Sequence, residues 1–338
     1  DDETLNEAPF ARQTAEILGT DHTEMSCSLA EAKDLIQKLP YYYDEPFGDS
    51  SAIPTIMVSQ LARKHVSVAL SADGGDEVFA GYNRYDFLMK HGQKLNKIPR
   101  PIRSTIANVM DKIPSDKIPF LKDGYNFHNR YEKLKNLLKN SSVDQMMASL
   151  NQQYSLRQVS TFFKKPDLTP IDQVYSDSTF YKESQSDLAY MMAIDYQTYM
   201  VDDILQKVDR ATMSVGLEGR DPFVDHNIIE WAARLPDNYK YHKGVKKHIL
   251  KEIVHQYVPK ETLERPKMGF AIPIASWLQN ELKPMVEDYL SASKIEKQGL
   301  FKVEEIEKLK NSFYGGKKEL DVKIWYFLCF QMWYEEWM

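Results

Sequence analysis

In the first seventy residues, segments with apolar positions at helical spacing alternate with segments that have the spacing of a strand. Small apolar residues at helical spacing over residues 8–18, with Gly19 after them, predict a helix that ends at this glycine. Alternation of apolar and polar positions predicts a strand over residues 22–28. The next apolar stripe predicts a helix over residues 29–39, which Pro40 should end because proline disrupts a helix interior.

A second strand and its flanking helices follow. Pro54 suits the first turn of a further helix, which leads to a buried strand over Val66–Leu70. A glycine-rich turn comes next, and Glu77 lies in the expected first turn of another helix. This order of elements predicts an α/β fold with an open parallel sheet. Ligands of such sheets bind beyond the C-terminal strand ends, where residues 71–77 lie.

From about residue 91 the pattern changes to basic segments interrupted by proline, with helical stretches that continue to residue 183. The two basic segments cover residues 97–103 and 112–119. A solvated helical insertion over residues 92–187 is the favoured interpretation. Recognition of a substrate or a partner by the basic side chains is the alternative.

The last part of the chain, residues 188–338, is predicted to be mainly helical. Asp225 can cap a helix that reaches Leu235. Further helices are predicted over residues 249–254, 274–290 and 303–313. The most apolar stretch, residues 324–334, is too short to span a bilayer, so we expect a terminal helix packed in the core.

Composition and charge narrow the functional classes. The 338 residues are 43% hydrophobic and 27% charged, which is ordinary for a globular protein. A net charge of −6 argues against nucleic acid as a partner, because that binding needs clustered Lys and Arg. Cys27 and Cys329 stand far apart, in no metal or redox spacing. We therefore expect buried thiols, a cytoplasmic location and no membrane association.

The turn after Leu70 carries the strongest candidate chemistry. It combines a glycine pair with three carboxylates, Asp73, Asp76 and Glu77, and contains no lysine. A strand that runs through glycines into a helix aims backbone N–H groups at an anion. Carboxylates repel a phosphate unless a divalent cation lies between them, or unless one of them accepts a proton. The turn therefore indicates metal-bridged nucleotide chemistry, and an acidic surface turn is the alternative.

Several strings in the same order along the chain resemble the glutamine-dependent asparagine synthetases. They are DEPFGDSSAIPT (44–55), LSADGGDEVFAGYNRY (70–85), KVDRATMSVGLEGRDPFVDH (207–226), GVKKHIL (244–250) and RPKMGFAIPIASWL (265–278). Together they extend over most of the sequence. The resemblance implies one synthetase domain over residues 1–338 with an adenine nucleotide alpha hydrolase-like fold. In that fold, residues 1–91 would form an incomplete α/β nucleotide-binding core.

The resemblance also implies a ligase reaction in two steps, with ATP and Mg²⁺. ATP activates a carboxylate, that of aspartate in the namesake enzymes, as an acyl-adenylate, and pyrophosphate leaves. Ammonia from glutamine then displaces AMP and gives the amide. These steps need Mg²⁺ on the phosphates, cationic side chains on the developing charge, and a base for the attacking nitrogen.

Most of the implied site residues lie in the acidic turn. Asp73 matches the position of a glutamate suggested as the base, and its side chain is one methylene shorter. Asp76 matches the position associated with Mg²⁺ and pyrophosphate, for which a carboxylate is a suitable ligand. The resemblance places Ser71, Ala72 and Gly74 against the nucleotide, with Ala72 at a position where glycine is common.

Two lysines complete the implied site. Lys267 matches a lysine held to stabilise the charge that develops on the adenylate, and Pro266 and Gly269 favour a defined loop around it. Lys247 matches a lysine that contacts phosphate. A generic surface lysine is the alternative in both cases. We expect Lys247 and Lys267 to face the same cleft as the acidic turn.

Two further charged clusters have no single interpretation. Helical spacing places Asp203, Lys207 and Arg210 near one face, where they would line the active-site wall or form a structural salt-bridge network. Arg220 and Asp221 precede a proline, and a structural role is favoured for them.

The remaining expectations concern partners and alternatives. The family's Ser-Gly-Gly-x-Asp-Ser loop and an N-terminal glutaminase domain are expected upstream of Asp1, and a homodimer is a further expectation. Two other functions stay open. One is amidation of a different carboxylate, such as that of a uronic acid sugar, and the other is a catalytically silent ATP-binding module.

Overall fold

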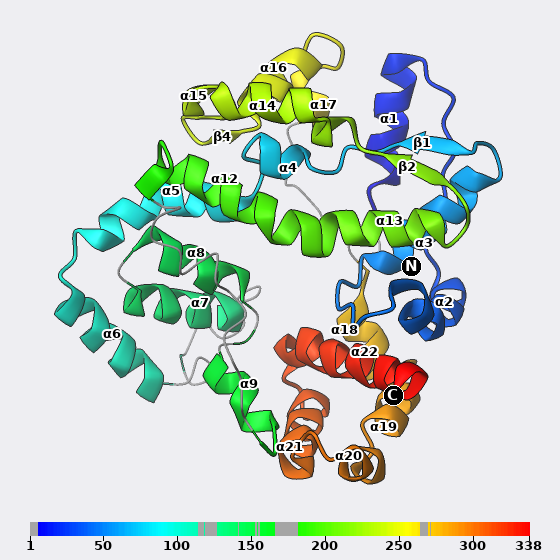
Figure 1. Ribbon diagram of the computed structural model, residues 1–338, viewed down its shortest axis with the longest axis vertical. Helices are drawn as coiled ribbons and strands as arrows, with labels where there is room; N and C mark the ends of the chain where they lie inside the picture. Colours follow the sequence, from blue (N-terminus) through cyan, green and yellow to red (C-terminus); the bar gives the residue numbers. More distant parts are fainter. Residues whose placement is uncertain are drawn as a thin grey trace.

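The computed structural model describes residues 6–113, 118, 127–140, 142–152, 154, 156–165, 182–263, 270 and 272–338. The described part is mostly helical and contains two short strand pairs (Figure 1). Its first elements are α1 (Ala8–Leu18), α2 (Leu29–Tyr43), α3 (Ala52–Arg63), β1 (Val68–Leu70), α4 (Gly75–Val78) and α5 (Asn83–Asn96). The next helices are α6 (Arg100–Lys112), α7 (Phe127–Lys139), α8 (Val143–Asn151) and α9 (Leu156–Phe162).

The second half follows the same helical pattern. It begins with α12 (Asp187–Gln197), a π-helical turn (Met200–Leu205), α13 (Gln206–Met213), β2 (Glu218–Arg220), a 3₁₀ turn (Pro222–Val224) and α14 (His226–Arg234). The middle contains α15 (Asp237–Lys240), β3 (Tyr241–His242), β4 (Val245–Lys246), α16 (His248–Val254) and α17 (Lys260–Leu263). The end contains α18 (Ile274–Gln279), α19 (Lys283–Tyr289), α20 (Ala292–Gln298), α21 (Val303–Tyr314), a 3₁₀ turn (Lys318–Leu320) and α22 (Asp321–Trp337).

A small parallel sheet joins two distant segments of the chain. Strand β1 pairs with β2 in parallel, with Val68 opposite Glu218 and Leu70 opposite Arg220. The strand predicted over Val66–Leu70 is confirmed over Val68–Leu70, but the prediction that it is buried is wrong, because Val68 is 37% and Leu70 73% exposed. The small parallel sheet is compatible with the α/β class. Because the strands are parallel, the segments that follow their C-terminal ends lie at the same edge of the sheet. The acidic turn therefore lies beside residues 221–225.

One long helical column crosses the molecule beneath this sheet. Helices α12 and α13 run end to end through the π-helical turn (green in Figure 1). Helix α13 packs against both α3 and β2. A Cβ on Gly219 would lie 3.2 Å from the Thr212 side chain, so β2 packs tightly against α13 at this point. This column therefore holds the sheet from one side.

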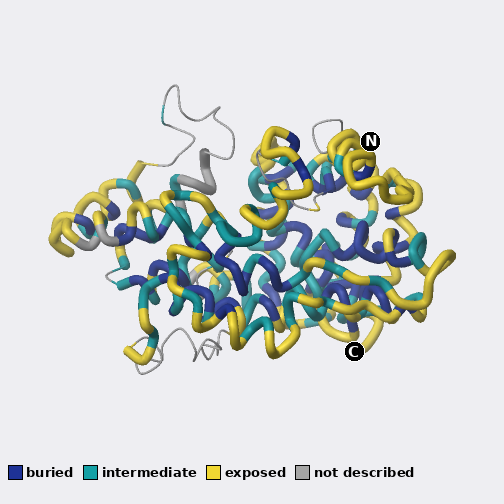
Figure 2. Tube along the Cα trace, turned by 90° about the horizontal axis from the view of Figure 1, so that it is seen from above, coloured by how far each residue is buried: buried dark blue, intermediate teal, exposed yellow. Residues whose placement is uncertain are grey.

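The main core joins the beginning and the end of the chain. Helices α2 and α3 pack against α18–α22 around buried Ile36, Ile53, Trp325 and Leu328. The Trp325 indole donates a hydrogen bond to the Gly48 carbonyl at 2.9 Å. The terminal helix is thus packed in the core, as predicted from residues 324–334. In Figure 2 the buried stretches run through the middle of the molecule and the exposed ones lie at its periphery.

A second core supports the acidic turn from the other side. Helices α5, α8 and α12 enclose buried Tyr85, Met146, Leu188 and Ile194, and Ala80 belongs to the same cluster. Helical structure in the described part of residues 92–187 agrees with the expected helical character of this region. None of the helices in the described residues is long and apolar enough to cross a membrane.

Three further sequence predictions about the elements are wrong. Residues 22–28 form no strand, because a strand needs a hydrogen-bonded neighbour and none of the described segments pairs with them. Helix α2 continues past Pro40 to Tyr43, whose buried ring stacks on Phe47 with centroids 4.4 Å apart. Residues 274–290 form two helices, because α18 ends at Gln279 and α19 begins only at Lys283.

Local signals succeeded where the structure depends on neighbours in sequence. Helix α1 ends at Gly19, whose φ of 64° suits glycine. Asp225 caps α14 by accepting a hydrogen bond from the Asn227 backbone N–H at 2.9 Å. Cys27 and Cys329 are free cysteines, half-buried and buried respectively.

Candidate functional site

The acidic turn is held by glycines at places where a side chain would not fit. Gly74 has a φ of 80°, and a Cβ there would lie 2.6 Å from the Val224 side chain. Helix α4, which follows it, is a single turn over Gly75–Val78. Glu77 lies in this helical turn, as predicted, and the helix ends after Val78.

The structure brings Lys247 to Asp76. The Lys247 ammonium lies 3.0 Å from Asp76 Oδ1, and the two side chains are 29% and 21% exposed. Lys247 follows the antiparallel β3–β4 pair and precedes α16, and its φ of 51° is uncommon for a residue with a side chain. Two predicted site residues from distant strings thus form one ion pair.

Gly81 makes this ion pair sterically possible. A Cβ on Gly81 would lie 1.8 Å from Asp76 Oδ1 and 2.3 Å from Lys247 Cε. The Gly81 N–H also donates to the Asp76 carbonyl at 2.8 Å, and Ala80 before it has a φ of 58°. The tight turn at Ala80 and Gly81 therefore forms one wall of the site. Nothing in the sequence pattern indicated this role, although the glycine lies inside the LSADGGDEVFAGYNRY string.

Ser71 and Asp73 form a second contact on the same turn. The Ser71 hydroxyl donates a hydrogen bond to Asp73 Oδ2, and the Ser71 backbone N–H donates to the Arg220 carbonyl at 2.9 Å. Asp221, which follows Arg220 in the chain, has a pKa that is raised by burial and by the charge of Asp73. Asp221, for which the sequence favoured a structural role, therefore lies at the predicted base. The parallel sheet explains this: Asp221 follows β2 as Ser71 follows β1.

A cavity opens next to Asp221. It has a volume of about 570 Å³ and lies between α13 and the end of β2, with Leu70, Thr212 and Arg220 among its lining residues. Leu70 is 73% exposed although it is a large apolar residue. The cavity is large enough for a small-molecule ligand.

Glu77 points away from this cavity into the protein. It is 2% exposed, and the Tyr82 hydroxyl donates a hydrogen bond to it. Burial raises the pKa of Glu77, and the contact with Tyr82 opposes that shift. The Arg84 guanidinium lies 3.8 Å from the centroid of the Tyr82 ring and forms a 2.7 Å ion pair with buried Asp195. These contacts hold the buried side of the acidic turn in place.

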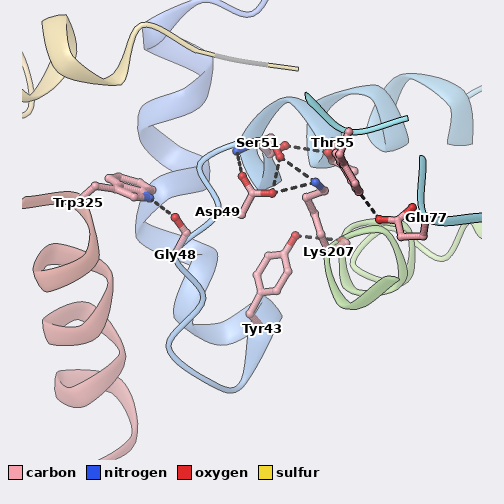
Figure 3. Close-up of polar contacts among 9 residues, drawn as sticks. Tyr43, Gly48, Asp49, Ser51, Thr55, Glu77, Lys207 and Trp325 are labelled. Atoms are coloured by element: carbon pink, nitrogen blue, oxygen red, sulfur yellow. Dashed lines mark hydrogen bonds and ion pairs between the residues drawn. The ribbon is translucent and has the colours of Figure 1, made fainter. Parts of the chain in front are cut away.

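A second lysine–aspartate pair lies inside the protein, around the start of α3 (Figure 3). The Lys207 ammonium contacts Asp49 Oδ2 at 2.8 Å and Ser51 Oγ at 2.9 Å. The Tyr43 hydroxyl donates to the Lys207 carbonyl at 3.1 Å. Burial alone would raise the pKa of Asp49, but the Lys207 ammonium lowers it below its ordinary value.

Asp203 lies next to this pair on the π-helical turn. Burial and the neighbouring Asp49 raise the pKa of Asp203 to about 7. Arg210, which the sequence placed on the same face, pairs with Asp44 at 3.1 Å. The cluster of Asp203, Lys207 and Arg210 therefore packs against residues 44–51, which supports the salt-bridge interpretation.

The donor set at the acidic turn fits Mg²⁺ in part. Asp76 offers a carboxylate, and Mg²⁺ is usually held by one or two carboxylates together with phosphate oxygens and water. Within the described ranges, no group of three or more His, Cys, Asp or Glu side chains could hold a metal by itself. A metal here would therefore depend on the phosphates of a nucleotide. Lys267, the other predicted catalytic lysine, lies outside the described residues.

The structure is mostly helical, and an acidic, glycine-rich turn and a lysine lie together at the edge of its small parallel sheet. A sequence model described as asparagine synthase matches residues 1–335. The chain belongs to the asparagine synthase family. This result confirms the family indicated by the sequence strings.

Similar proteins also bear the name of this family. The chain is 29% identical over 333 residues to asparagine synthetase [glutamine-hydrolyzing] 1 of Bacillus subtilis, a match that covers 98% of this chain and 50% of the relative. A putative asparagine synthetase of Mycobacterium tuberculosis is 29% identical over 346 residues, with 98% and 49% covered. The human asparagine synthetase is 36% identical over 105 residues, 28% of this chain and 18% of that protein. The chain thus spans about half the length of the first two relatives.

Proposed function

We propose that the chain is the synthetase part of a glutamine-hydrolysing asparagine synthetase. It would use ATP to adenylate the side-chain carboxylate of aspartate and then form the amide with ammonia, releasing AMP and pyrophosphate. The names of the relatives support this reaction. The proposal includes an adenine nucleotide alpha hydrolase-like fold, a glutaminase partner domain, a cytoplasmic location and a homodimer.

The single observation that carries the proposal is the contact between Asp76 and Lys247. These residues come from two distant strings and meet at 3.0 Å at the sheet edge, where nucleotides bind in parallel α/β folds. A carboxylate and an ammonium in contact are the groups that a metal-bound pyrophosphate requires, one for the cation and one for the phosphate. With a ligand present, Asp76 would contact the metal and Lys247 the phosphate.

Each residue of the turn has a proposed task. Asp73 takes the proton from the attacking nitrogen, while Ser71, Ala72 and Gly74 lie against the nucleotide. Mg²⁺ would neutralise phosphate charge and make pyrophosphate a better leaving group. Lys267 is proposed to stabilise the charge on the adenylate, on the pattern of the family strings alone.

ATP–pyrophosphate exchange tests the proposal, because it reports adenylation without the amide step. The protein at its full natural length should exchange label in the presence of aspartate. Asp76→Asn and Lys247→Ala should each lower the exchange rate at least about 100-fold, the order of an electrostatic contact made in the transition state. Lys246→Ala is the matched control, since the neighbouring Lys246 donates a hydrogen bond to the Asn83 side chain.

The result also separates the alternatives. Exchange with a uronic acid but not with aspartate would assign the protein to another amidotransferase. No exchange with any acid, together with measurable ATP binding, would identify a silent nucleotide-binding module. Equal exchange by the Lys247→Ala and Lys246→Ala variants would contradict the assigned site.

A further inference from the structure

Two imidazole rings stack on each other next to Lys247. His242 is the last residue of β3, and His248 is the first residue of α16. Their ring centroids lie 5.0 Å apart, with an angle of 25° between the ring planes. Aromatic pairs attract each other at centroid separations of about 4.5–7 Å. The stack therefore connects the β3–β4 hairpin directly to the helix that follows it.

The chain between the two rings has a left-handed backbone at both of its turns. Lys243 and Gly244, with φ of 48° and 87°, form the turn of the hairpin, in which His242 pairs with Val245. Lys247 has a φ of 51° and a ψ of 39° immediately before α16. A left-handed conformation is unfavourable for a residue with a side chain, so it persists only where the surrounding structure holds it.

Each of the two segments that meet at this lysine is fixed to an element next to the acidic turn. The Tyr241 hydroxyl donates to Asp86 Oδ1 at 2.7 Å, which attaches the hairpin to α5. On the other side, Ile249 and Leu250 of α16 pack against the buried cluster that contains Val78 of α4. The hairpin and α16 thus have separate supports. The stacked imidazoles join these two supports to each other.

The other contacts of the two histidines do not account for their arrangement. His248 Nδ1 lies 3.9 Å from the Glu252 carboxylate, whose side chain is 69% exposed. An exposed ion pair of this length contributes little to stability, because solvent screens it. In the part of the chain that the structure describes, neither imidazole belongs to a group of side chains that could hold a metal. The stack is thus the main contact of both rings.

We propose that His242 and His248 are positioning residues, whose stacked rings hold Lys247 in the left-handed conformation that directs its ammonium group to Asp76. The inference rests on the proposed function, in which Lys247 contacts a phosphate oxygen. The ammonium lies 3.0 Å from Asp76 Oδ1. A cation that is already in place needs no rearrangement when charge develops on the phosphate. Without the stack, the backbone of Lys247 can leave the left-handed region, and the ammonium moves away from the acidic turn.

The test substitutes His248 in the protein at its full natural length and measures ATP–pyrophosphate exchange with aspartate. His248→Ala should lower the exchange rate about 3- to 10-fold, the order expected for the loss of one aromatic pair. His248→Phe retains a flat ring and should stay within about twofold of the unsubstituted protein. His248→Gln retains a polar side chain without a ring, and it should be as slow as His248→Ala. The comparison separates ring stacking from hydrogen bonding.

A second measurement distinguishes positioning from a merely structural effect. In a Lys247→Ala background, adding His248→Ala should change exchange less than about twofold, because the stack acts through the lysine that is already absent. His91→Ala is the matched control, since His91 contacts Phe87 within α5 at the same centroid separation of 5.0 Å. Urea unfolding measures the stability of both histidine variants, and only His248→Ala should lose exchange. Glu252→Gln should leave exchange unchanged.

The outcomes separate this inference from the proposed function. A loss in His248→Ala that His248→Phe restores, and that disappears in the Lys247→Ala background, supports the positioning role. Full exchange by His248→Ala, while the unsubstituted protein is active, overturns the inference alone. A loss that His248→Phe does not restore, or that persists in the Lys247→Ala background, also overturns it alone. Absence of exchange in the unsubstituted protein with every acid overturns the proposed function and the inference with it.

Discussion

Two lysine–aspartate pairs of almost equal length have opposite surroundings. Lys207 and Asp49 meet at 2.8 Å, and Lys247 and Asp76 at 3.0 Å. The Lys207 side chain is 11% exposed and has Ser51 as a second partner, whereas the Lys247 side chain is 29% exposed. Lys207 belongs to a regular helix, and Lys247 has a left-handed backbone. The two pairs therefore differ in burial, in further hydrogen-bond partners and in backbone conformation, and not in the distance between the lysine and the carboxylate.

The difference indicates which pair can be exchanged for a ligand. The Lys207 pair is satisfied by protein groups on every side, so breaking it would leave a buried charge without a partner. The Lys247 pair is reached by solvent and joins two strained turns, at Ala80 and at Lys247 itself. Backbone strain of this kind costs about 1–3 kcal/mol per residue and is concentrated at functional sites. We therefore expect the inner pair, Lys207 and Asp49, to serve stability and propose that the outer pair, Lys247 and Asp76, serves binding.

The sharpest test of this comparison removes each lysine in turn. Lys207→Ala should lower the free energy of unfolding by about 3 kcal/mol or more, because Asp49 stays buried beside Asp203. Lys247→Ala should lower it by less than about 1 kcal/mol, since solvent screens the charge that it leaves. Chemical denaturation of both variants measures this. Equal losses of stability would remove the distinction between the pairs.

The titration of Asp203 offers a second test of the inner pair. Its pKa is raised to about 7, so the folded protein binds a proton there that the unfolded chain has released above about pH 4. The unfolded state then binds fewer protons, and stability falls as the pH rises from about 4 to 7. Asp203→Asn should remove this slope and raise the free energy of unfolding at pH 8 by roughly 2–4 kcal/mol.

Urea unfolding at several pH values measures the Asp203 effect. Asp202→Asn is a suitable control, because Asp202 lies on the same turn and is exposed. A slope that persists between pH 4 and 7 in Asp203→Asn would assign the pH dependence to another carboxyl group.

Gly81→Ala tests the outer pair without removing either charge. The new Cβ would lie 1.8 Å from Asp76 Oδ1 and 2.3 Å from Lys247 Cε, so the two side chains must separate. We expect at least about a 10-fold loss of pyrophosphate exchange, with a loss of about 1–2 kcal/mol in stability, typical of overpacking. Gly92→Ala is the matched control, because the nearest atom to its Cβ is 3.8 Å away within a helix. That variant should gain up to about 1 kcal/mol.

The sequence predicted those features that depend on nearby residues or on recognisable strings. The strand before the acidic turn, the Asp225 cap and the end of α1 at Gly19 follow from local signals. The family strings predicted that Lys247 and Asp76 lie in one site, and the two side chains are in contact. Local sequence gives no reason for this contact, because 170 positions separate the two residues.

What the sequence missed depends on tertiary neighbours. Asp221 gains its place from the pairing of β2 with β1, and β2 has no strand-like pattern of its own because its three residues are exposed. Helix α2 passes through Pro40 because buried Tyr43 and its stacking on Phe47 stabilise the last turn. The role of Gly81 depends on the position of Lys247, which lies far away in the chain and approaches Gly81 only in the folded protein.

Removal of the Tyr43 hydroxyl is expected to have the smallest effect, and it tests whether the inner pair acts separately from the outer one. The Tyr43 hydroxyl donates to the Lys207 carbonyl at 3.1 Å, and the residue is 1% exposed. Tyr43→Phe should lower the free energy of unfolding by about 1 kcal/mol, the net value of one buried hydrogen bond. It should leave pyrophosphate exchange unchanged, because Tyr43 touches the inner pair and not the acidic turn. A large loss of exchange in this variant, without a matching loss of stability, would mean that the two pairs act as one site.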